Sequence, residues 1–276
     1  MRNLLIFLLL PLTLGLGLAH GAVYTVNVGQ TIQSAIDSAS SGDEIIVNGA
    51  FFDEDLVIDG KSLTLRRQSL ISEIKSISFT NASGTSILEG FKVRQDLNAT
   101  GSDVHISNVD FGGDLNASNS SLRVAYCDVI GFVLVSQGDL TITNSDIHQS
   151  VTVNQGSLKL TKSTVDKDVS INHSTNSFGS PTRTVIAQTT ITEKLTSNAP
   201  NSLVSYNTIR HSTFKGNATI VGNIINGRNI ASIGIDLNGT NSVAKIYNNY
   251  IQNFVGGIGD NSHIGIAVRN QVQVEI

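Results

Sequence analysis

The chain has 276 residues, of which 40% are hydrophobic, 14% are charged and 5% are aromatic, with no Trp and a net charge of −4. Helix surfaces are normally filled with Glu, Lys, Arg, Gln and Ala, so a polar content drawn mainly from Asn, Ser, Thr and Gly excludes a helical bundle and favours strands and turns. The net negative charge argues against broad nucleic-acid binding, which needs a concentrated basic surface.

The first segment, residues 1–21, has the pattern of a signal peptide. Arg2 provides the positive charge, an apolar run extends from Leu4 to Leu18, and Ala19 and Gly21 are the small residues that a signal peptidase reads. A membrane anchor is the alternative, but the run is shorter than the ~20 residues that a spanning helix needs. We therefore expect a secreted, periplasmic or cell-surface protein without a transmembrane anchor in the mature chain.

The next segment, about 22–60, is expected to cap the domain that fills residues 22–276. Apolar residues in TIQSAIDSAS follow helical spacing, and Gly42 stands where such a helix would end. The strand-like stretches DEIIV, DLVID and SLTL follow. An amphipathic helix can cover the open apolar end of a stack of strands.

The middle of the chain repeats every 18 residues. The segments that begin at Val104, Leu122, Leu140 and Leu158 align so that five columns are apolar throughout. These columns are Val104, Leu122, Leu140, Leu158; Ile106, Val124, Ile142, Leu160; Phe111, Val129, Ile147, Val165; Leu115, Val133, Val151, Val169; and Ala117, Val135, Val153, Ile171. The period returns from Ile186 onward, after an insertion around residues 173–182.

This pattern predicts an all-β solenoid with three short strands in each coil. Alternation with period two is typical of strands, and recurrence of each column places like residues above one another at ~4.8 Å. A sandwich or barrel would not keep five columns in register through consecutive units of equal length. From a repeat of about 20 residues we expect nine or ten coils.

The coil phrases resemble a known superfamily. The segment TIQSAIDSASSGDEIIVNGAFFDEDLVIDGKSLTL and the phrases ISNVDF, ITNSDI, VSYNTI and IYNNYI are similar to the pectate-lyase-like right-handed parallel β-helix superfamily. The resemblance implies that fold, but it does not imply one activity, because the scaffold carries lyases, hydrolases, esterases and non-catalytic surface proteins. The chain lacks the motifs of the polygalacturonase, pectin methylesterase and pectate lyase branches.

An acidic column is the candidate metal site. Asp110, Asp128 and Asp146 each precede an inward residue and should therefore point outward. Stacked carboxylates repel one another unless a cation screens them, and calcium is the hard cation that suits several oxygens. The alternative is that Asp is simply a favourable turn residue, since Thr164 follows in the next coil.

A second outward column holds His105, Arg123, Thr141 and Lys159. Such a strip can hold an acidic sugar, and Arg123 and Lys159 are the candidate catalytic residues, because an elimination reaction needs a base. His105, Arg210, His211 and Tyr247 are the candidate substrate-binding residues. The alternative is an ordinary solvated strand face.

Two readings of function stay open. The chain is expected to bind, and could also cleave, an extracellular polysaccharide; the alternative is a non-catalytic, adhesin-like structural or display protein. The few aromatic residues limit sugar stacking, and the single Cys127 is expected to be a packing residue. Carboxylate and cationic columns that meet in one groove would favour an enzyme. The C-terminal HIGIAVRNQVQVEI alternates like strands without a polar cap, so we expect a partner or further coils at that edge.

Overall fold

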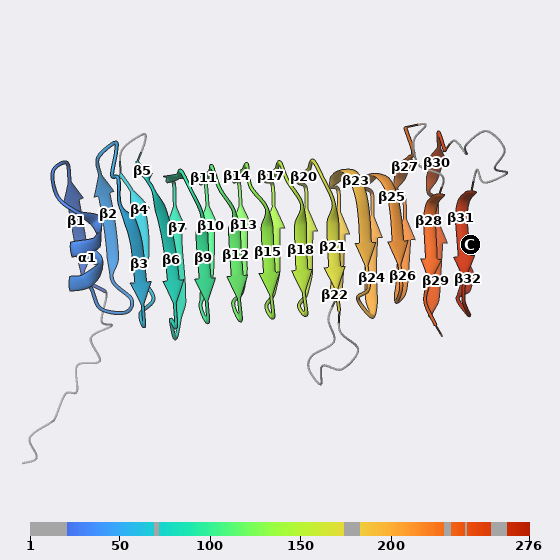
Figure 1. Cartoon of the computed structure of the whole chain (residues 1–276), viewed down its shortest axis with the longest axis horizontal. Coiled ribbons are helices and arrows are strands. Elements are labelled where there is room, and N and C mark those ends of the chain that lie inside the picture. The colour runs from blue at the N-terminus through green and yellow to red at the C-terminus, as the bar shows by residue number, and fades with distance from the viewer. Residues whose placement is uncertain (1–20, 69–71, 174–182, 229–232, 241, 255–263) are drawn as a thin grey trace, which may run out of the picture.

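A computed structural model of the chain describes residues 21–68, 72–173, 183–228, 233–240, 242–254 and 264–276. It is a parallel β-solenoid of about 11 turns, drawn out as a rod with its first turn at one end (Figure 1). The predicted parallel β-helix is confirmed. The predicted nine or ten coils are too few. Hydrogen-bonded neighbours lie 18 residues apart in the middle of the chain and 16 apart at Asn207 and Asn223.

One wall of the rod is a 13-stranded parallel sheet, here called sheet A. Its strands, in order, are β1 (Val23–Asn27), β2 (Glu44–Asn48), β4 (Thr64–Arg67), β7 (Thr85–Glu89), β10 (Asp103–Ser107), β13 (Leu122–Ala125), β16 (Leu140–Thr143), β19 (Leu158–Thr161), β22 (Arg183–Ala187), β24 (Asn201–Ser205), β26 (Asn217–Val221), β29 (Val243–Tyr247) and β32 (Gln273–Glu275).

The remaining strands form sheet B, which has 19 strands in two rows. The row that follows sheet A in each coil consists of β5 (Glu73–Ile74), β8 (Lys92–Val93), β11 (Asp110–Phe111), β14 (Asp128–Val129), β17 (Asp146–Ile147), β20 (Thr164–Val165), β27 (Ile224–Asn226) and β30 (Tyr250–Gln252). The other row consists of β3 (Asp55–Asp59), β6 (Ser76–Thr80), β9 (Leu97–Thr100), β12 (Leu115–Ser118), β15 (Val133–Ser136), β18 (Val151–Asn154), β21 (Val169–Asn172), β28 (Ile233–Asn238) and β31 (Ile264–Arg269). β23 (Thr190–Ser197) and β25 (Thr208–Phe214) run through both rows.

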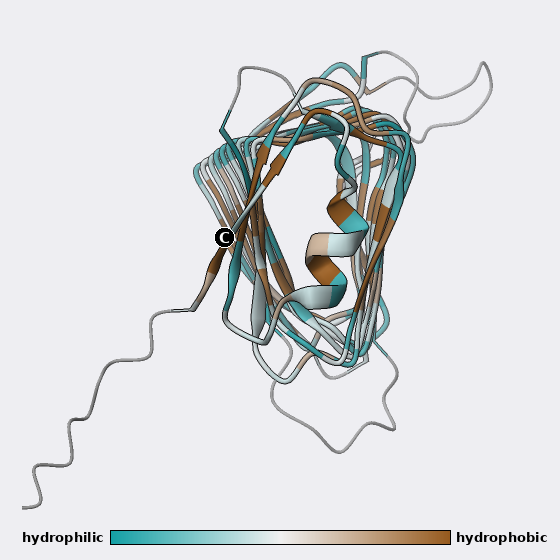
Figure 2. Cartoon of the chain, turned by 90° about the vertical axis from the view of Figure 1, so that its left-hand side faces the viewer, coloured by the Kyte–Doolittle hydropathy of each residue, from teal (hydrophilic) through white to brown (hydrophobic). Residues whose placement is uncertain are grey.

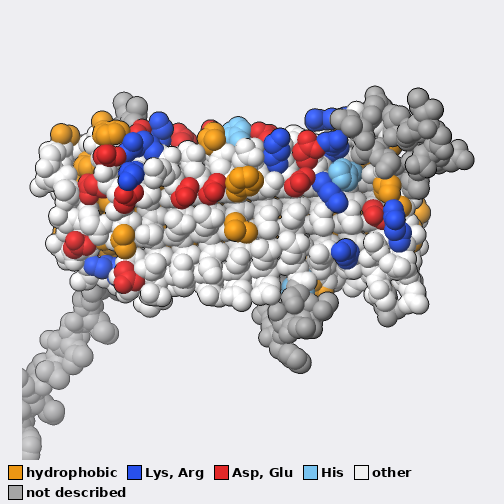
Figure 3. All heavy atoms as spheres, viewed as in Figure 1, with side chains coloured by type: hydrophobic (Ala, Val, Ile, Leu, Met, Phe, Trp, Pro, Cys, Tyr) orange, Lys and Arg blue, Asp and Glu red, His pale blue; other side chains and the backbone are white. Residues whose placement is uncertain are grey.

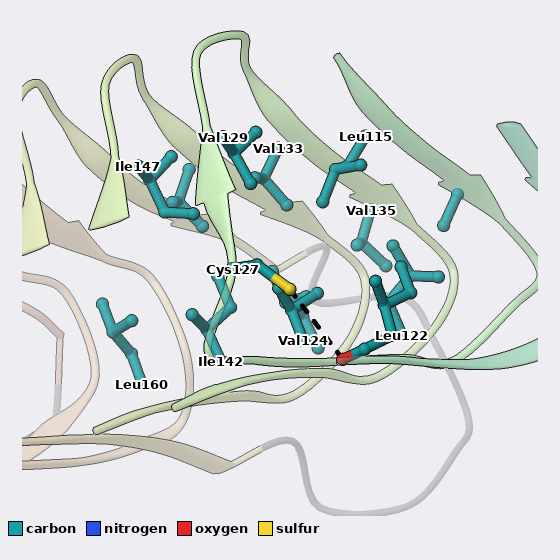
Figure 4. Packing of buried hydrophobic residues seen from close by; sticks show 14 of the residues in the cluster. Leu115, Leu122, Val124, Cys127, Val129, Val133, Val135, Ile142, Ile147 and Leu160 are labelled. Carbon is teal, nitrogen blue, oxygen red and sulfur yellow. Dashed lines mark hydrogen bonds between the residues drawn. The ribbon is translucent and has the colours of Figure 1, made fainter. Parts of the chain in front are cut away.

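The five apolar columns are the core of the rod. Leu122 pairs with Val104 on one side and with Leu140 on the other, and the other columns pair in the same register. Side chains from successive coils point into the interior and touch there (Figure 4). Burying each aliphatic side chain contributes about 1.5–3 kcal/mol relative to exposure, so this ladder is the main source of stability.

A left-handed residue turns the chain from sheet A into sheet B. Asn108, Tyr126, Asn144 and Lys162 have φ values of 53°, 56°, 48° and 51° at this corner. Asn adopts this conformation more readily than other residues with a side chain, which explains the recurring Asn of the coil phrases. Lys162 therefore stands where Asn108 and Asn144 stand in their coils.

A second ladder, inside the rod, runs beside this corner. In most coils the residue after the left-handed one is buried, although Asn249 is half-buried. In several coils its backbone N–H donates to the matching side chain of the next coil, as Cys127 N does to Ser145 Oγ at 3.1 Å. Cys127 is itself buried, and burial raises the pKa of its thiol to about 11. This agrees with the packing role expected of it.

The helix α1 (Ile32–Ser38) closes the first turn. In an end-on view it lies across the opening of the coil (Figure 2), with Ile32 and Ile36 buried in the core. Glu54 accepts hydrogen bonds from the N–H groups of Ile32 and Gln33, and Lys61 donates to the last carbonyls of the helix. These bonds satisfy helix-terminal groups that lack partners within the helix.

The predicted end of this helix needs a correction. The C-cap is Ala39, so the helix ends before Gly42, which has a φ of 92° in the turn that leads into β2. The predicted signal peptide, except for Gly21, and most of the predicted insertion lie outside the described residues. Among the described residues there is no helix long and apolar enough to cross a membrane. The alternating C-terminal segment contributes β31 and β32.

Candidate functional site

The predicted cationic column exists as a ladder on the outer surface of sheet A. Arg123 on β13 pairs with His105 on β10 and with Thr141 on β16, and Thr141 pairs in turn with Lys159 on β19. At ~4.8 Å between strands, Arg123 and Lys159 stand about 10 Å apart. Partial burial, and next the charge of Arg123, lower the pKa of His105, which favours its neutral form.

The same ladder continues into a groove on the C-terminal half of sheet A. Beyond Lys159 its positions are Val185, Leu203, Thr219 and Lys245. The groove has a volume of about 390 Å³ and crosses four strands. Its lining residues are Arg183, Asn201, Ser202, Leu203, Asn217, Ala218, Thr219, Val243 and Lys245.

About half of sheet A, the seven strands from β13 to β29, has only cationic charged residues within its strands, and the exposed Asp139 directly precedes β16. The seven strands from β13 to β29 contain Arg123, Lys159, Arg183 and Lys245, and none of these described strands contains Asp or Glu. At ~4.8 Å per step the face extends about 29 Å along the rod. The next strand, β32, provides Glu275, whose carboxylate lies 3.0 Å from Lys245 Nζ. We call this surface, from β13 to β29, the cationic face.

Tyr247 is a predicted substrate residue that lies beside the groove. It is on β29, two residues after Lys245, and it pairs with Val221. A hydrogen bond with Glu275 raises the pKa of the Tyr247 phenol and lowers that of the Glu275 carboxyl. The phenol is therefore neutral and already has a partner at the edge of the cationic face.

The predicted pair Arg210 and His211 lies elsewhere, on β25 of sheet B. Arg210 forms an ion pair with Glu193, and His211 pairs with Lys194 of the preceding coil. Burial first, then Lys194 and Arg210, lower the pKa of His211. Its Nδ1 is buried and lacks a hydrogen-bond partner among the described residues. The structure therefore does not bring this pair together with His105 or Tyr247.

The predicted acidic column is a ladder on the first row of sheet B. Asp128 pairs with Asp110 and with Asp146. His148 bridges the ladder to the next coil: its Nε2 lies 2.9 Å from Asp128 Oδ1 and its Nδ1 lies 2.9 Å from Asp166 Oδ2. The hydrogen bond to Asp166, followed by the charge of Asp128, raises the pKa of His148.

The geometry of this ladder bears on metal binding. The carboxylates of Asp128 and Asp166 contact opposite nitrogens of one imidazole, so they do not converge on a common point. In the part of the chain that the structure describes, no group of three or more His, Cys, Asp or Glu residues is placed to hold a metal ion. Calcium at Asp110, Asp128 and Asp146 stays a prediction, with Asp128 already partnered.

The acidic and cationic ladders belong to different sheets. The carboxylates lie on β11, β14 and β17 of sheet B, and the cations lie on sheet A. In the view of Figure 3, many of the charged side chains lie along one long edge of the rod, above a broad area that is almost uncharged. The two columns do not meet in one groove. A groove that held both columns would have favoured an enzyme.

The sequence did not identify Arg183, the residue that extends the cationic face into the groove. Arg183 follows an interruption of the 18-residue period, so simple counting does not place it. Its pairing with Asn201 on the next coil shows where it lies. Alternation of buried and outward positions in residues 184–187 could have aligned this strand with the preceding coil. It could not have aligned the residues that flank the strand.

Comparisons of the chain with protein-family models, with curated proteins and with solved structures find no match. The fold therefore rests on the strand pairing described above, and the candidate site rests on the chemistry of the residues that line it.

Proposed function

We propose that the protein binds an acidic polysaccharide along the cationic face, without cleaving it. The single observation that carries the proposal is the charge of that face, which has four Arg and Lys residues and no Asp or Glu within strands β13 to β29, with Asp139 just outside β16. An anionic polymer that lies along the rod would meet Arg123, Lys159, Arg183 and Lys245 in succession. Arg can hold a carboxylate or sulfate through two parallel hydrogen bonds, which adds orientation to attraction.

The groove supports the proposal because its lining suits a sugar. Its volume of about 390 Å³ is within the range of small-molecule sites. Asn201, Asn217 and Thr219 offer hydrogen-bond donors and acceptors to hydroxyl groups, while Leu203 and Val243 offer apolar contact to the C–H face of a ring. Arg183 and Lys245 stand on the outermost of the four strands, where they would bracket a short anionic segment.

Binding is favoured over cleavage by the separation of the charged columns. A general base must come within hydrogen-bond reach of the proton that it removes, with a second group placed to stabilise the developing charge. Arg123 and Lys159 are about 10 Å apart, and the carboxylate ladder is on the other sheet. On this proposal the resemblance to the pectate-lyase-like superfamily extends to the fold and not to lyase activity. The signal-peptide pattern supports a location outside the cytoplasm.

The proposal is tested by measuring the affinity of the protein for polygalacturonate and for its fully methyl-esterified, neutral form. We expect binding of the acidic polymer alone, weakened by salt. Alanine at Arg123, Lys159, Arg183 and Lys245 together should weaken binding about tenfold or more, since each lost contact costs about 0.5–1 kcal/mol. Lys194→Ala on sheet B is the matched control and should leave affinity unchanged.

Three outcomes would count against the proposal. Failure to bind acidic polymers, or equal binding by the wild type and the fourfold variant, would remove the cationic face as the site. Formation of an unsaturated product, followed by ultraviolet absorbance, would show that the protein cleaves its ligand.

A further inference from the structure

One coil in the middle of the rod exposes apolar side chains on sheet B. Ile130, Phe132 and Leu134 are 51%, 51% and 38% exposed at alternate positions, the first two between β14 and β15 and the third on β15. We call these three residues the apolar strip. Figure 3 shows hydrophobic side chains of this kind midway along the rod, among acidic ones.

In the coils on either side of the apolar strip, the matching positions are polar or have no side chain. Leu134 pairs with Asn116 on one side and with Thr152 on the other. By the same register Phe132 stands between Asp114 and Ser150, and Ile130 stands between Gly112 and His148. The inward columns already supply the core of this coil, so folding does not require apolar residues at these outward positions.

Carboxylates surround the apolar strip. In the four coils from β11 to β21, the part of the chain that belongs to sheet B and its turns carries six Asp residues, against Lys162 at one corner and Lys167 among the described residues. The acidic residues are Asp110, Asp114, Asp128, Asp146, Asp166 and Asp168. Exposed apolar area that is rimmed by polar groups marks an interaction site more often than an accident of sequence.

The charge selects the partner. A second copy of the chain docked strip to strip would bring carboxylates against carboxylates, and an anionic polymer or membrane would be repelled in the same way. A basic partner gains from both features. The apolar strip spans at most about 13 Å at ~3.3 Å per residue, since the chain bends at Ile130 and Gly131, so it offers length for up to about two turns of an α-helix. We propose that the apolar strip is the docking site for a basic amphipathic helix of a partner protein, through apolar contact at Phe132 and Leu134 and ion pairs with the surrounding Asp residues.

This proposal is independent of polysaccharide binding, because it concerns sheet B and a ligand of opposite charge. The probe is a fluorescent Lys/Leu peptide whose Leu residues recur at helical spacing, followed by fluorescence anisotropy. The comparison peptides are oligolysine of equal charge and a Glu/Leu peptide of the same pattern. We expect the Lys/Leu peptide to bind at least about tenfold more tightly than either one.

The decisive variant replaces Phe132 by Ser and Leu134 by Thr together. Ser150 and Thr152 already occupy the matching positions of the next coil, so these substitutions suit the fold. The double variant should bind the Lys/Leu peptide about tenfold more weakly at unchanged melting temperature. The control is Val57→Thr, an apolar residue that is 47% exposed on β3 and should leave binding unchanged.

Four outcomes would overturn the inference: no binding of the Lys/Leu peptide, equal binding of oligolysine, equal binding by the double variant, or preference for the Glu/Leu peptide. Self-association of the free protein that the double variant abolishes would assign the apolar strip to a second copy of the chain instead.

Discussion

Replacement of Asn223 by Ala would test the ladder of buried amides that links the C-terminal coils. Oδ1 of Asn223 accepts from the backbone N–H of Asn207 at 2.9 Å and from Nδ2 of Asn207 at 3.0 Å. Its own Nδ2 donates to Val204 O, Val221 O and Asn249 Oδ1 at 2.9, 3.1 and 2.9 Å. Asn223 is 1% exposed, so water does not replace these bonds.

The magnitude follows from the groups that lose a partner. The backbone N–H of Asn207 is left without an acceptor inside the rod, which costs about 1–3 kcal/mol, and each further lost bond costs about 0.5–1.5 kcal/mol. Three acceptors share the two N–H bonds of the Asn223 amide, so the total free-energy cost is smaller than the number of lost hydrogen bonds suggests. We expect Asn223→Ala to lower the free energy of unfolding by about 3–5 kcal/mol.

Urea denaturation followed by circular dichroism would measure this loss, and amide hydrogen exchange would locate it in the coils around Asn223. Asn98→Ala is the matched control, because Asn98 is exposed on β9 and accepts a bond from Asn116 Nδ2 at 3.3 Å. It should change stability by less than about 0.5 kcal/mol. A loss in Asn223→Ala no larger than in Asn98→Ala would refute the reasoning that buried amides hold the coils together.

Three further predictions concern single side chains. Lys162→Asn should stabilise the rod by about 0.5–1 kcal/mol, because Lys162 has a φ of 51° and Asn tolerates that conformation better; a lower urea midpoint would contradict this. Because the pKa of His148 is raised in the folded state, the stability that its charge adds is present below its ordinary value and is lost as the pH rises through the raised one. The wild type should therefore exceed His148→Gln in melting temperature at about pH 5.5 and lose that advantage by about pH 8, with a small effect because the side chain is 41% exposed. If Asp110, Asp128 and Asp146 bind calcium, adding it should raise the melting temperature of the wild type and not that of Asp128→Asn; an unchanged wild-type curve would remove the site.

The sequence predicted the fold well because the period is local and the stacking repeats it. Inward positions such as Leu122, Val124 and Val129 were identified from alternation alone, and all three are buried. The repeated Asn indicates a turn, and the structure shows that the residue at this turn is left-handed, at Lys162 as well. The helix boundary was less certain, since both Ala39 and Gly42 can follow a helix and only the hydrogen bonds show that Ala39 is the cap.

The candidate site was predicted only in part. The column from His105 to Lys159 was found because those coils have equal length. Beyond residue 172 the pairing distance changes: Asn201 pairs with Asn217, and Ala218 pairs with Ala244. Counting could therefore not show that the ladder of Lys159 continues to Lys245. Arg210 and His211 looked suitable by residue type, but they lie on sheet B.

The sequence by itself determined that this chain is a parallel β-solenoid with an apolar interior, because a column of inward aliphatic residues is stable only when every coil repeats it. Only the tertiary structure decided which outward residues share a surface. Alternation separates inward from outward positions, but the sheet on which an outward residue lies depends on the length of each coil and on the corner at which the chain turns. For that reason Arg123 and Asp128, which are close in sequence within one coil, belong to different sheets of the rod.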